Sequence, residues 1–236
     1  MNRIRTFALL AGALLSFSAC NTDNTLYYNI TEMGNIRDGK IVSDSGLTFT
    51  ITEMTEQYSL EGLDRVIFLA DVLESTGEMA YNIRLKSLFK VPSPDIVKAA
   101  DFVEPTEESA DRPARIQTAW FGGEYINFNI AYLVNDGSKV EHNFTLAEQT
   151  VPDGKDTLFL RLFHDAGAED EHWDGSADLE LSGLGLQTVY YSFPIKSFAT
   201  TGDTPRPVKV FYRWYHTEDG EVMPSTELYF LKGELE

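Results

Sequence analysis

The densest group of chemically active side chains lies between His164 and Asp174, where eleven residues include two His, three Asp and two Glu. Carboxylate oxygens and imidazole nitrogens bind divalent cations, so this cluster is the first candidate for a metal site. Its spacing matches neither a zinc-binding helix nor a calcium-binding loop, and Gly167 and Gly175 flank it. We therefore predict a solvated acidic loop, with a weak calcium site as the alternative. The ligands of such a site would be Asp165, Glu169, Asp170 and Asp174.

Aromatic residues form a second group of candidate contacts. Trp173 lies within the acidic, glycine-flanked loop and is therefore hard to bury, so we predict an exposed ring that contacts a ligand. Other aromatic pairs include rings on the face opposite the predicted core. We expect these rings to pack between domains or on both faces of a strand under a loop, and the alternative is a platform for sugars or an anchor for a protein. These rings are Tyr27-Tyr28, Trp120-Phe121, Tyr190-Tyr191, Phe211 and Tyr215.

Signatures of common enzymes are absent from the sequence. It has no G-x-S-x-G nucleophile elbow, no P-loop and no dinucleotide-binding fingerprint, and Ser182 to Gly185 is typical of a turn. His164 and His216 each follow an apolar alternation, which indicates strand ends at the rim of the core, while His142 and His172 are predicted to be exposed. With 37 acidic residues, a pair of carboxylates at glycosidase spacing remains an open alternative. We predict no enzymatic activity and no cofactor.

The charge balance restricts the choice of partner. The chain of 236 residues has 19 Lys and Arg against 37 Asp and Glu, a formal charge of -18. Nucleic acids and anionic membrane surfaces bind through basic residues, so both are excluded as partners. Its 43% hydrophobic residues are typical of a folded globular protein.

The N-terminus predicts export and lipid attachment. Arg3 and Arg5 precede an apolar run from Phe7 to Phe17. This run of about 11 residues is shorter than the roughly 20 that a membrane-spanning helix needs. Small residues then precede Cys20, the single Cys of the chain. We therefore predict a lipoprotein signal peptide over residues 1–19 and lipidation of Cys20, with the lipid as the only attachment to the bacterial outer membrane.

Turns and alternation predict an all-β fold. Asp-Gly, the commonest dipeptide of tight hairpins, occurs five times. Short segments alternate in polarity with a period of two, as half-buried strands do. Examples of the apolar positions are Tyr81, Ile83 and Leu85; Ile126, Phe128, Ile130 and Tyr132; Leu158, Leu160 and Leu162; and Val208, Val210, Tyr212 and Trp214. Residues 66–69 are apolar on both faces, which predicts a strand covered on both sides.

A Pro-rich, acidic region over residues 91–113 predicts a domain boundary. Ser93 before Pro94 resembles a helix start, so we expect one short helix over residues 94–100. Upstream, over residues 20–90, we predict five strands: 26–36, 40–43, 46–52, 65–74 and 79–89. Downstream, over residues 114–236, we predict seven: 116–121, 124–134, 140–149, 157–164, 186–196, 207–217 and 226–233. Five strands suit a small barrel and seven an immunoglobulin-like sandwich.

Several segments carry a resemblance to a known family. They are Tyr28-Asn-Ile-Thr-Glu-Met-Gly-Asn-Ile36, Gly39-Lys-Ile-Val-Ser-Asp-Ser-Gly-Leu-Thr48, Arg65-Val-Ile-Phe-Leu-Ala-Asp71, Tyr81-Asn-Ile-Arg-Leu85 and Trp120-Phe-Gly-Gly-Glu-Tyr-Ile-Asn-Phe-Asn129. With the lipoprotein signal, the chain resembles the NigD-like lipoproteins of Bacteroides-type bacteria. The resemblance implies an N-terminal OB-like barrel and a C-terminal β-sandwich, and it brings no catalytic residues.

The sequence therefore predicts a lipid-anchored protein of the cell envelope that binds rather than catalyses. Its partner would be an envelope protein. The alternative is a glycan-binding surface lipoprotein of a nutrient-uptake system, in which coplanar exposed aromatic rings would bind the sugar.

Overall fold

The structure is a computed structural model that describes most of the chain beyond the N-terminus. The described residues are 25–103, 111–135, 137–150, 157–167, 184–198, 200–201, 204–218 and 221–231. Cys20 and the predicted signal peptide lie outside them. Within these ranges every named element is a strand, so the predicted all-β class is confirmed. No helix in the described part of the chain is long and apolar enough to cross a membrane.

The first five strands form a closed barrel. They are β1 (Tyr27–Arg37), β2 (Lys40–Ser43), β3 (Thr48–Met54), β4 (Arg65–Gly77) and β5 (Ala80–Lys90). The strand order β1-β2-β3-β5-β4 closes through antiparallel pairing of β1 with β4, and β3 pairs with β5 in parallel. This order is compatible with the predicted OB-like barrel. The alternating inner residues, among them Phe49, Val66, Phe68 and Ile83, fill the barrel as one buried cluster.

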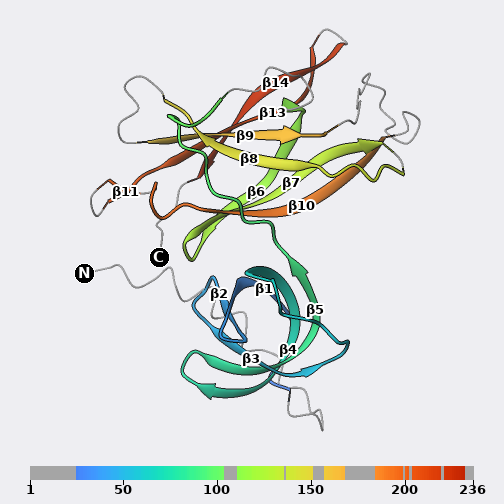
Figure 1. Cartoon of the computed structure of the whole chain (residues 1–236), viewed down its shortest axis with the longest axis vertical. Coiled ribbons are helices and arrows are strands. Elements are labelled where there is room, and N and C mark those ends of the chain that lie inside the picture. The colour runs from blue at the N-terminus through green and yellow to red at the C-terminus, as the bar shows by residue number, and fades with distance from the viewer. Residues whose placement is uncertain are drawn as a thin grey trace.

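The later strands form a sandwich of two sheets, above the barrel in Figure 1. One sheet has the order β10-β7-β6, from β6 (Ala114–Gly122), β7 (Tyr125–Asn135) and β10 (Leu184–Pro194). The other has the order β14-β13-β9-β8, from β8 (Asn143–Glu148), β9 (Leu158–Asp165), β13 (Val208–Glu218) and β14 (Glu221–Leu231). Two short strands, β11 (Thr200–Thr201) and β12 (Thr204–Pro205), pair with each other and were not predicted.

The predicted alternation places the core of the sandwich correctly. The apolar positions of β7, β9 and β13 face one buried cluster between the two sheets. The intervening residues of β7, such as Asn127 and Asn129, lie on the opposite face of that sheet. On that face, Asn127 accepts a hydrogen bond from Arg65 of the barrel. Because side chains alternate between the two faces of a strand, the same strand supplies residues to the sandwich core and to the contact with the barrel.

The predicted helix over residues 94–100 is wrong. This segment is an extended connection, in which Val97 forms a parallel bridge with Ala147 of β8. The Val97 N–H donates to the Leu146 carbonyl at 2.9 Å, and the Glu148 N–H donates to the Val97 carbonyl at 2.8 Å. The edge of β8 supplies the backbone partners that a helix would otherwise provide, and this tertiary pairing outweighs the local helix-start signal.

Candidate functional site

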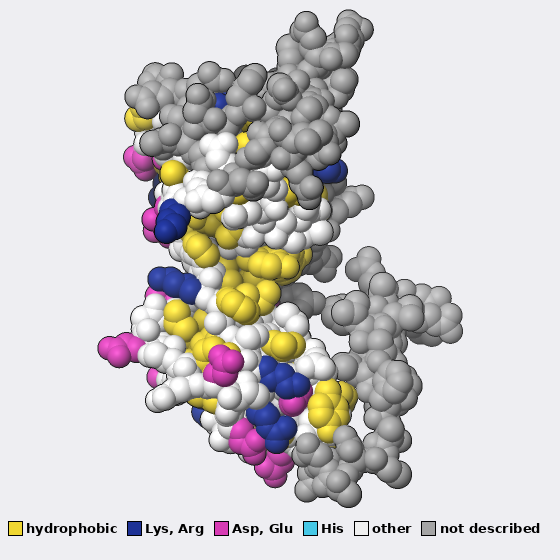
Figure 2. All heavy atoms as spheres, turned by 90° about the vertical axis from the view of Figure 1, so that its right-hand side faces the viewer, with side chains coloured by type: hydrophobic (Ala, Val, Ile, Leu, Met, Phe, Trp, Pro, Cys, Tyr) yellow, Lys and Arg dark blue, Asp and Glu magenta, His cyan; other side chains and the backbone are white. Residues whose placement is uncertain are grey.

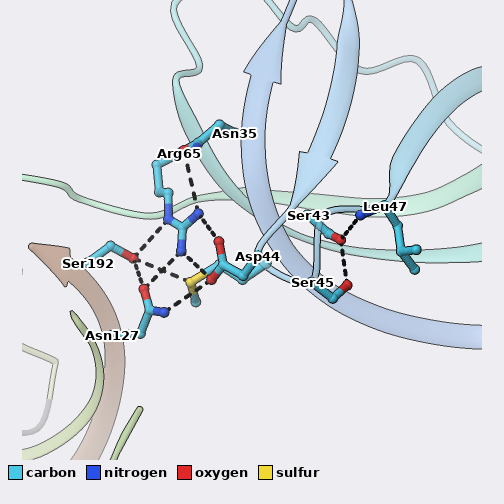
Figure 3. A network of polar contacts seen from close by, with 9 residues as sticks. Asn35, Ser43, Asp44, Ser45, Leu47, Arg65, Asn127 and Ser192 are labelled. Carbon is cyan, nitrogen blue, oxygen red and sulfur yellow. Dashed lines mark hydrogen bonds and ion pairs between the residues drawn. The ribbon is translucent and has the colours of Figure 1, made fainter. Parts of the chain in front are cut away.

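A buried arginine joins the barrel to the sandwich. Arg65, at the start of β4, is only 2% exposed, and its guanidinium points at residues of both parts (Figure 3). It binds Asp44 with two bonds of 2.5 and 2.6 Å, and it donates to Asn127 Oδ1 at 2.9 Å and Ser192 Oγ at 3.0 Å. A longer bond of 3.5 Å reaches Asn35 Oδ1. All five guanidinium donors thus have acceptors, which makes burial of the charge tolerable.

The acceptors around Arg65 also bind one another. Ser192 Oγ donates to Asn127 Oδ1 at 2.6 Å, and Asn127 Nδ2 donates to Asp44 Oδ2 at 3.1 Å. The Tyr125 ring lies 4.2 Å from Arg65 Cζ, close enough for a cation–π contact. Asp44 and Arg65 come from the barrel, whereas Tyr125, Asn127 and Ser192 come from β7 and β10. We call these residues, with Asn35, the junction network.

Local backbone features hold Asp44 in position. It occupies the turn between β2 and β3, where its N–H donates to the Met33 carbonyl at 2.9 Å. Ser43 Oγ accepts the Leu47 N–H at 3.2 Å and so closes the same turn. Gly122 at the end of β6 leaves room for the carboxylate, because a Cβ there would lie 2.4 Å from Asp44 Oδ2. The turn and this glycine together allow the bidentate ion pair.

Beside the junction network lies an open apolar groove of about 500 Å³ between the barrel and β10. Its volume is in the range of about 300–1,000 Å³ that ligand sites commonly have. The lining side chains are mostly apolar, and Phe89 is 62% exposed. The groove is lined by Thr31, Ile67, Phe68, Leu69, Ser87, Phe89, Lys90, Val91, Thr188, Val189 and Tyr190. We call it the junction groove. On the face shown in Figure 2, hydrophobic side chains gather at the level where barrel and sandwich meet.

The network and the groove lie side by side because the same strands supply both. Ile67 and Leu69 follow Arg65 by two and four residues on β4, so all three share the outer face of the barrel. Thr188 and Tyr190 precede Ser192 by four and two residues on β10. The residues of β4 predicted to be covered on both faces are buried on the inner face, at Val66 and Phe68, and only half-buried on the outer face. The apolar residues on the outer face of β4, Ile67 and Leu69, line the junction groove.

The predicted metal site is described only at Asp165. This residue is exposed, and its Oδ1 accepts the Gly167 N–H at 2.8 Å, a local turn bond. Glu169, Asp170 and Asp174 lie outside the described residues, as does Trp173, the predicted ligand contact. Among the residues that the structure describes, no three His, Cys, Asp or Glu side chains gather where they could hold a metal ion.

Two of the histidines differ from their prediction. His164 is buried rather than at the rim, at 1% exposure, and it packs parallel to Phe144 with ring centroids 4.6 Å apart. His142 is half-buried rather than exposed, and its Nδ1 lies 2.8 Å from His164 Nε2 in a hydrogen bond. Burial, and then the neighbouring His142, lower the pKa of His164 to about 3, so this imidazole is neutral at physiological pH. The pair packs against Tyr132 and serves the core of the sandwich.

The residues of the junction network were not singled out as a site by sequence reasoning. Most of them fall within the segments that carry the family resemblance: Asn35, Asp44, Arg65, Tyr125 and Asn127. Gly122, which makes room for Asp44, falls within the same segments. Those segments mark turns and strands, and the structure shows that they also supply the contacts that join the two parts. An arginine at the start of an otherwise apolar strand was the available signal.

Comparisons with known proteins agree with this architecture. Residues 99–224, more than half of the chain, match the family model described as the NigD-like C-terminal beta sandwich domain. No curated protein matches the chain significantly.

Solved structures from Bacteroides species share the whole fold. A protein of unknown function from Bacteroides vulgatus has a TM-score of 0.56 at 17% identity, covering 87% of this chain and 92% of that one. A NigD-like immunity protein from Bacteroides caccae has a TM-score of 0.54 at 18% identity, covering 87% and 96%. A candidate lipoprotein from Bacteroides fragilis has a TM-score of 0.58 at 12% identity, covering 87% and 98%. At such identities the similarity shows the fold alone. Through the match over residues 99–224, with the same all-β architecture, the chain belongs to the NigD-like family.

Proposed function

We propose that this protein is a lipid-anchored component of the cell envelope that acts by binding another protein and not by catalysis. The junction groove is the observation that carries the proposal. It is an open apolar surface with an exposed aromatic ring, Phe89, at a junction whose geometry the buried Arg65 network fixes. Apolar surfaces of this kind, rimmed by polar residues, mark sites of contact with other molecules.

The composition of the groove supports binding over catalysis. Among the described residues that line it, the titratable side chains are Lys90 and Tyr190, and none is a carboxylate or an imidazole. General acid–base or nucleophilic catalysis needs paired groups within hydrogen-bond reach of a reacting atom, and the groove offers mainly contact area.

The proposed envelope location rests on the N-terminal pattern ending at Cys20, and the similarity to a candidate lipoprotein supports it. Mass spectrometry of the protein from cells would identify an N-terminal Cys20 bearing acyl chains. A Cys20→Ser variant is expected to lose the acyl chains and to leave the membrane fraction. Membrane retention of that variant would contradict lipid anchoring.

The proposed binding role is tested by crosslinking in native cells, followed by affinity purification of the tagged protein and identification of the co-purifying proteins. We expect one envelope protein in stoichiometric amount. Recovery of background proteins alone would contradict a stable protein partner.

The alternative, a glycan-binding surface lipoprotein, requires coplanar exposed rings. In the described structure Trp120 and Tyr190 are near the groove, but their rings meet edge to face, at 75° with centroids 6.4 Å apart. Sugar platforms use ring faces, so this pair does not favour the alternative. Binding to a panel of polysaccharides that a Trp173→Ala change abolishes would favour glycans instead.

A further inference from the structure

We propose that the junction groove binds an extended segment of a partner protein, which adds as a strand to the free edge of β10. This inference rests on the binding function proposed above and gives it a site and a mode. Four observations carry it: the backbone of β10, the contrasting edge of β8, the lining of the groove and the charge at its rim.

The outer edge of β10 has unused backbone hydrogen-bonding groups. Pairing of β10 with β7 runs without a bulge from Leu184 to Pro194. On the other side, the Ser192 N–H donates outward to the Pro92 carbonyl at 3.0 Å. Because backbone direction alternates along a strand, the N–H and carbonyl groups of Leu186, Thr188 and Tyr190 also point outward. In the described part of the chain these outward groups have no hydrogen-bond partner.

The edge of β8, in contrast, is paired with another segment of the chain. Val97 of the connection lies along β8 and exchanges hydrogen bonds with Leu146 and Glu148. Among the described residues, the backbone hydrogen bond from the same connection to β10 is the one at the Pro92 carbonyl. Beyond this single bond, no described segment pairs with the outer edge of β10, so the edge at Leu186, Thr188 and Tyr190 is available to an added strand.

The groove fits a polypeptide in particular. Thr188, Val189 and Tyr190 from β10 line one side, and Ile67, Leu69 and Phe89 from the barrel line the other. An added strand would bond its backbone to the edge of β10, and every second side chain would point onto the apolar barrel wall. Only a polypeptide backbone presents donors and acceptors at the two-residue repeat of this edge, and neither sugars nor lipid chains do so.

The positive charge of Lys90 at the rim of the groove favours a partner with a negative charge. Lys90 is the charged side chain of the lining, it is exposed, and it has no ion-pair partner among the described residues. The partner segment therefore carries alternating apolar residues and a carboxylate near the Lys90 end, where it completes an ion pair.

The test uses short random linear peptides displayed on phage, selected on the purified protein. The selected peptides are then synthesised, and their affinity is measured by fluorescence anisotropy. We expect enrichment of peptides that alternate apolar residues and contain Asp or Glu. T188P removes one outward N–H without touching the β7 ladder, a change that edge strands tolerate, and is expected to weaken binding at least about tenfold. T188V keeps the N–H and the side-chain shape and is the matched control, with unchanged affinity.

Two further measurements keep the test independent of how well T188P folds. Methylating the peptide amides one at a time should abolish binding at every second position and spare the positions between. F89A and K90E, both at exposed positions, should each weaken binding, and K90E should do so most for peptides with a carboxylate at that end. Failure to enrich any peptide, equal affinity for T188P and T188V, or methylation effects without alternation would each overturn the proposal. A dimer of the wild-type protein that T188P dissolves would overturn it in favour of a second copy.

The inference and the proposed function fail separately. An envelope protein that co-purifies equally with the wild-type protein and with F89A would retain the binding function and refute this site. Absence of any co-purifying protein would refute the function itself, whatever the peptides do.

Discussion

The junction between barrel and sandwich has two sides that share strands β4 and β10, and they differ in polarity and in burial. On the Arg65 side the contact is polar, buried and fully hydrogen-bonded, whereas on the Phe89 side it is apolar and open. Burial of apolar surface is favourable, so a junction that served only to hold the two parts together would be expected to bury the apolar side as well. The difference shows that the polar side fixes how the two parts contact each other, and it is consistent with the proposal that the apolar side binds a partner.

The largest expected effect is on the closed side. Arg65→Leu leaves the largely buried Asp44 carboxylate, 13% exposed, without its ion-pair partner, and we expect a loss of about 3 kcal/mol in the free energy of unfolding. Chemical denaturation measures it. Lys196→Met, which breaks the exposed ion pair with Glu124, is the control and should cost less than about 1 kcal/mol. Equal losses in the two variants would mean that the network does not hold the junction.

A smaller loss is expected from Gly122→Ala. The added Cβ would lie 2.4 Å from Asp44 Oδ2 and must displace the carboxylate from Arg65. We expect a loss of about 1–3 kcal/mol in the free energy of unfolding, the cost of disturbing buried polar partners. Gly77→Ala is the matched control, because its Cβ meets only Ala80 Cβ at 3.6 Å. If Gly122→Ala is as stable as Gly77→Ala, the Asp44 carboxylate can move away from the added Cβ without loss of stability, and the close approach at Gly122 does not matter for the junction.

On the open side, substitution should leave stability almost unchanged. Phe89→Ser alters a side chain that is 62% exposed, so the free energy of unfolding should change by less than about 0.5 kcal/mol. Phe68→Ser, in the barrel core on the neighbouring strand, should cost several kcal/mol and provides the contrast. A large loss for Phe89→Ser would show that the groove residue stabilises the fold and is not reserved for a ligand.

The smallest effect is expected at Glu32. Burial, and then the negative charge of Asp44, raise the pKa of its carboxyl above the ordinary value. A raised carboxyl pKa means that the folded protein binds the proton more readily, so ionised Glu32 lowers stability at neutral pH. Glu32→Gln should therefore raise the melting temperature slightly at pH 7, an advantage that fades as the pH falls through the raised pKa and is gone once the pH is below the ordinary pKa. Glu53→Gln, which removes the partner of Arg84, should give no rise. A gain for Glu32→Gln that persists at low pH would contradict the electrostatic origin.

The strands could be predicted from the sequence because their signals are local. Alternation placed Ile126, Phe128 and Ile130 in the sandwich core, and hairpin dipeptides such as Asp38-Gly39 marked turns. The helix expected after Ser93 fails for the opposite reason. Its local start signal was outweighed by pairing of Val97 with β8, a contact between segments 50 residues apart.

The site was harder to predict because its members are distant in sequence. Arg65 and Ser192 are separated by 127 positions, and Arg65 and Asn127 by 62. Pairing of this kind follows from the docking of two folded parts, which no periodicity encodes. The apolar outer face of β4, at Ile67 and Leu69, was visible in the sequence, but the predicted cover over that face is incomplete, because both residues are only half-buried and line the open groove.

The most direct test of the account places a photo-crosslinking amino acid at position 89 in living cells. The same amino acid at position 54 is the control, because Met54 is also an exposed apolar residue, at 41%, and does not line the groove. We expect a discrete protein adduct from position 89, lost when T188P is added in the same chain, and none from position 54. Adducts that form equally from both positions, or that survive T188P, would contradict the claim that the open side of the junction is the binding site.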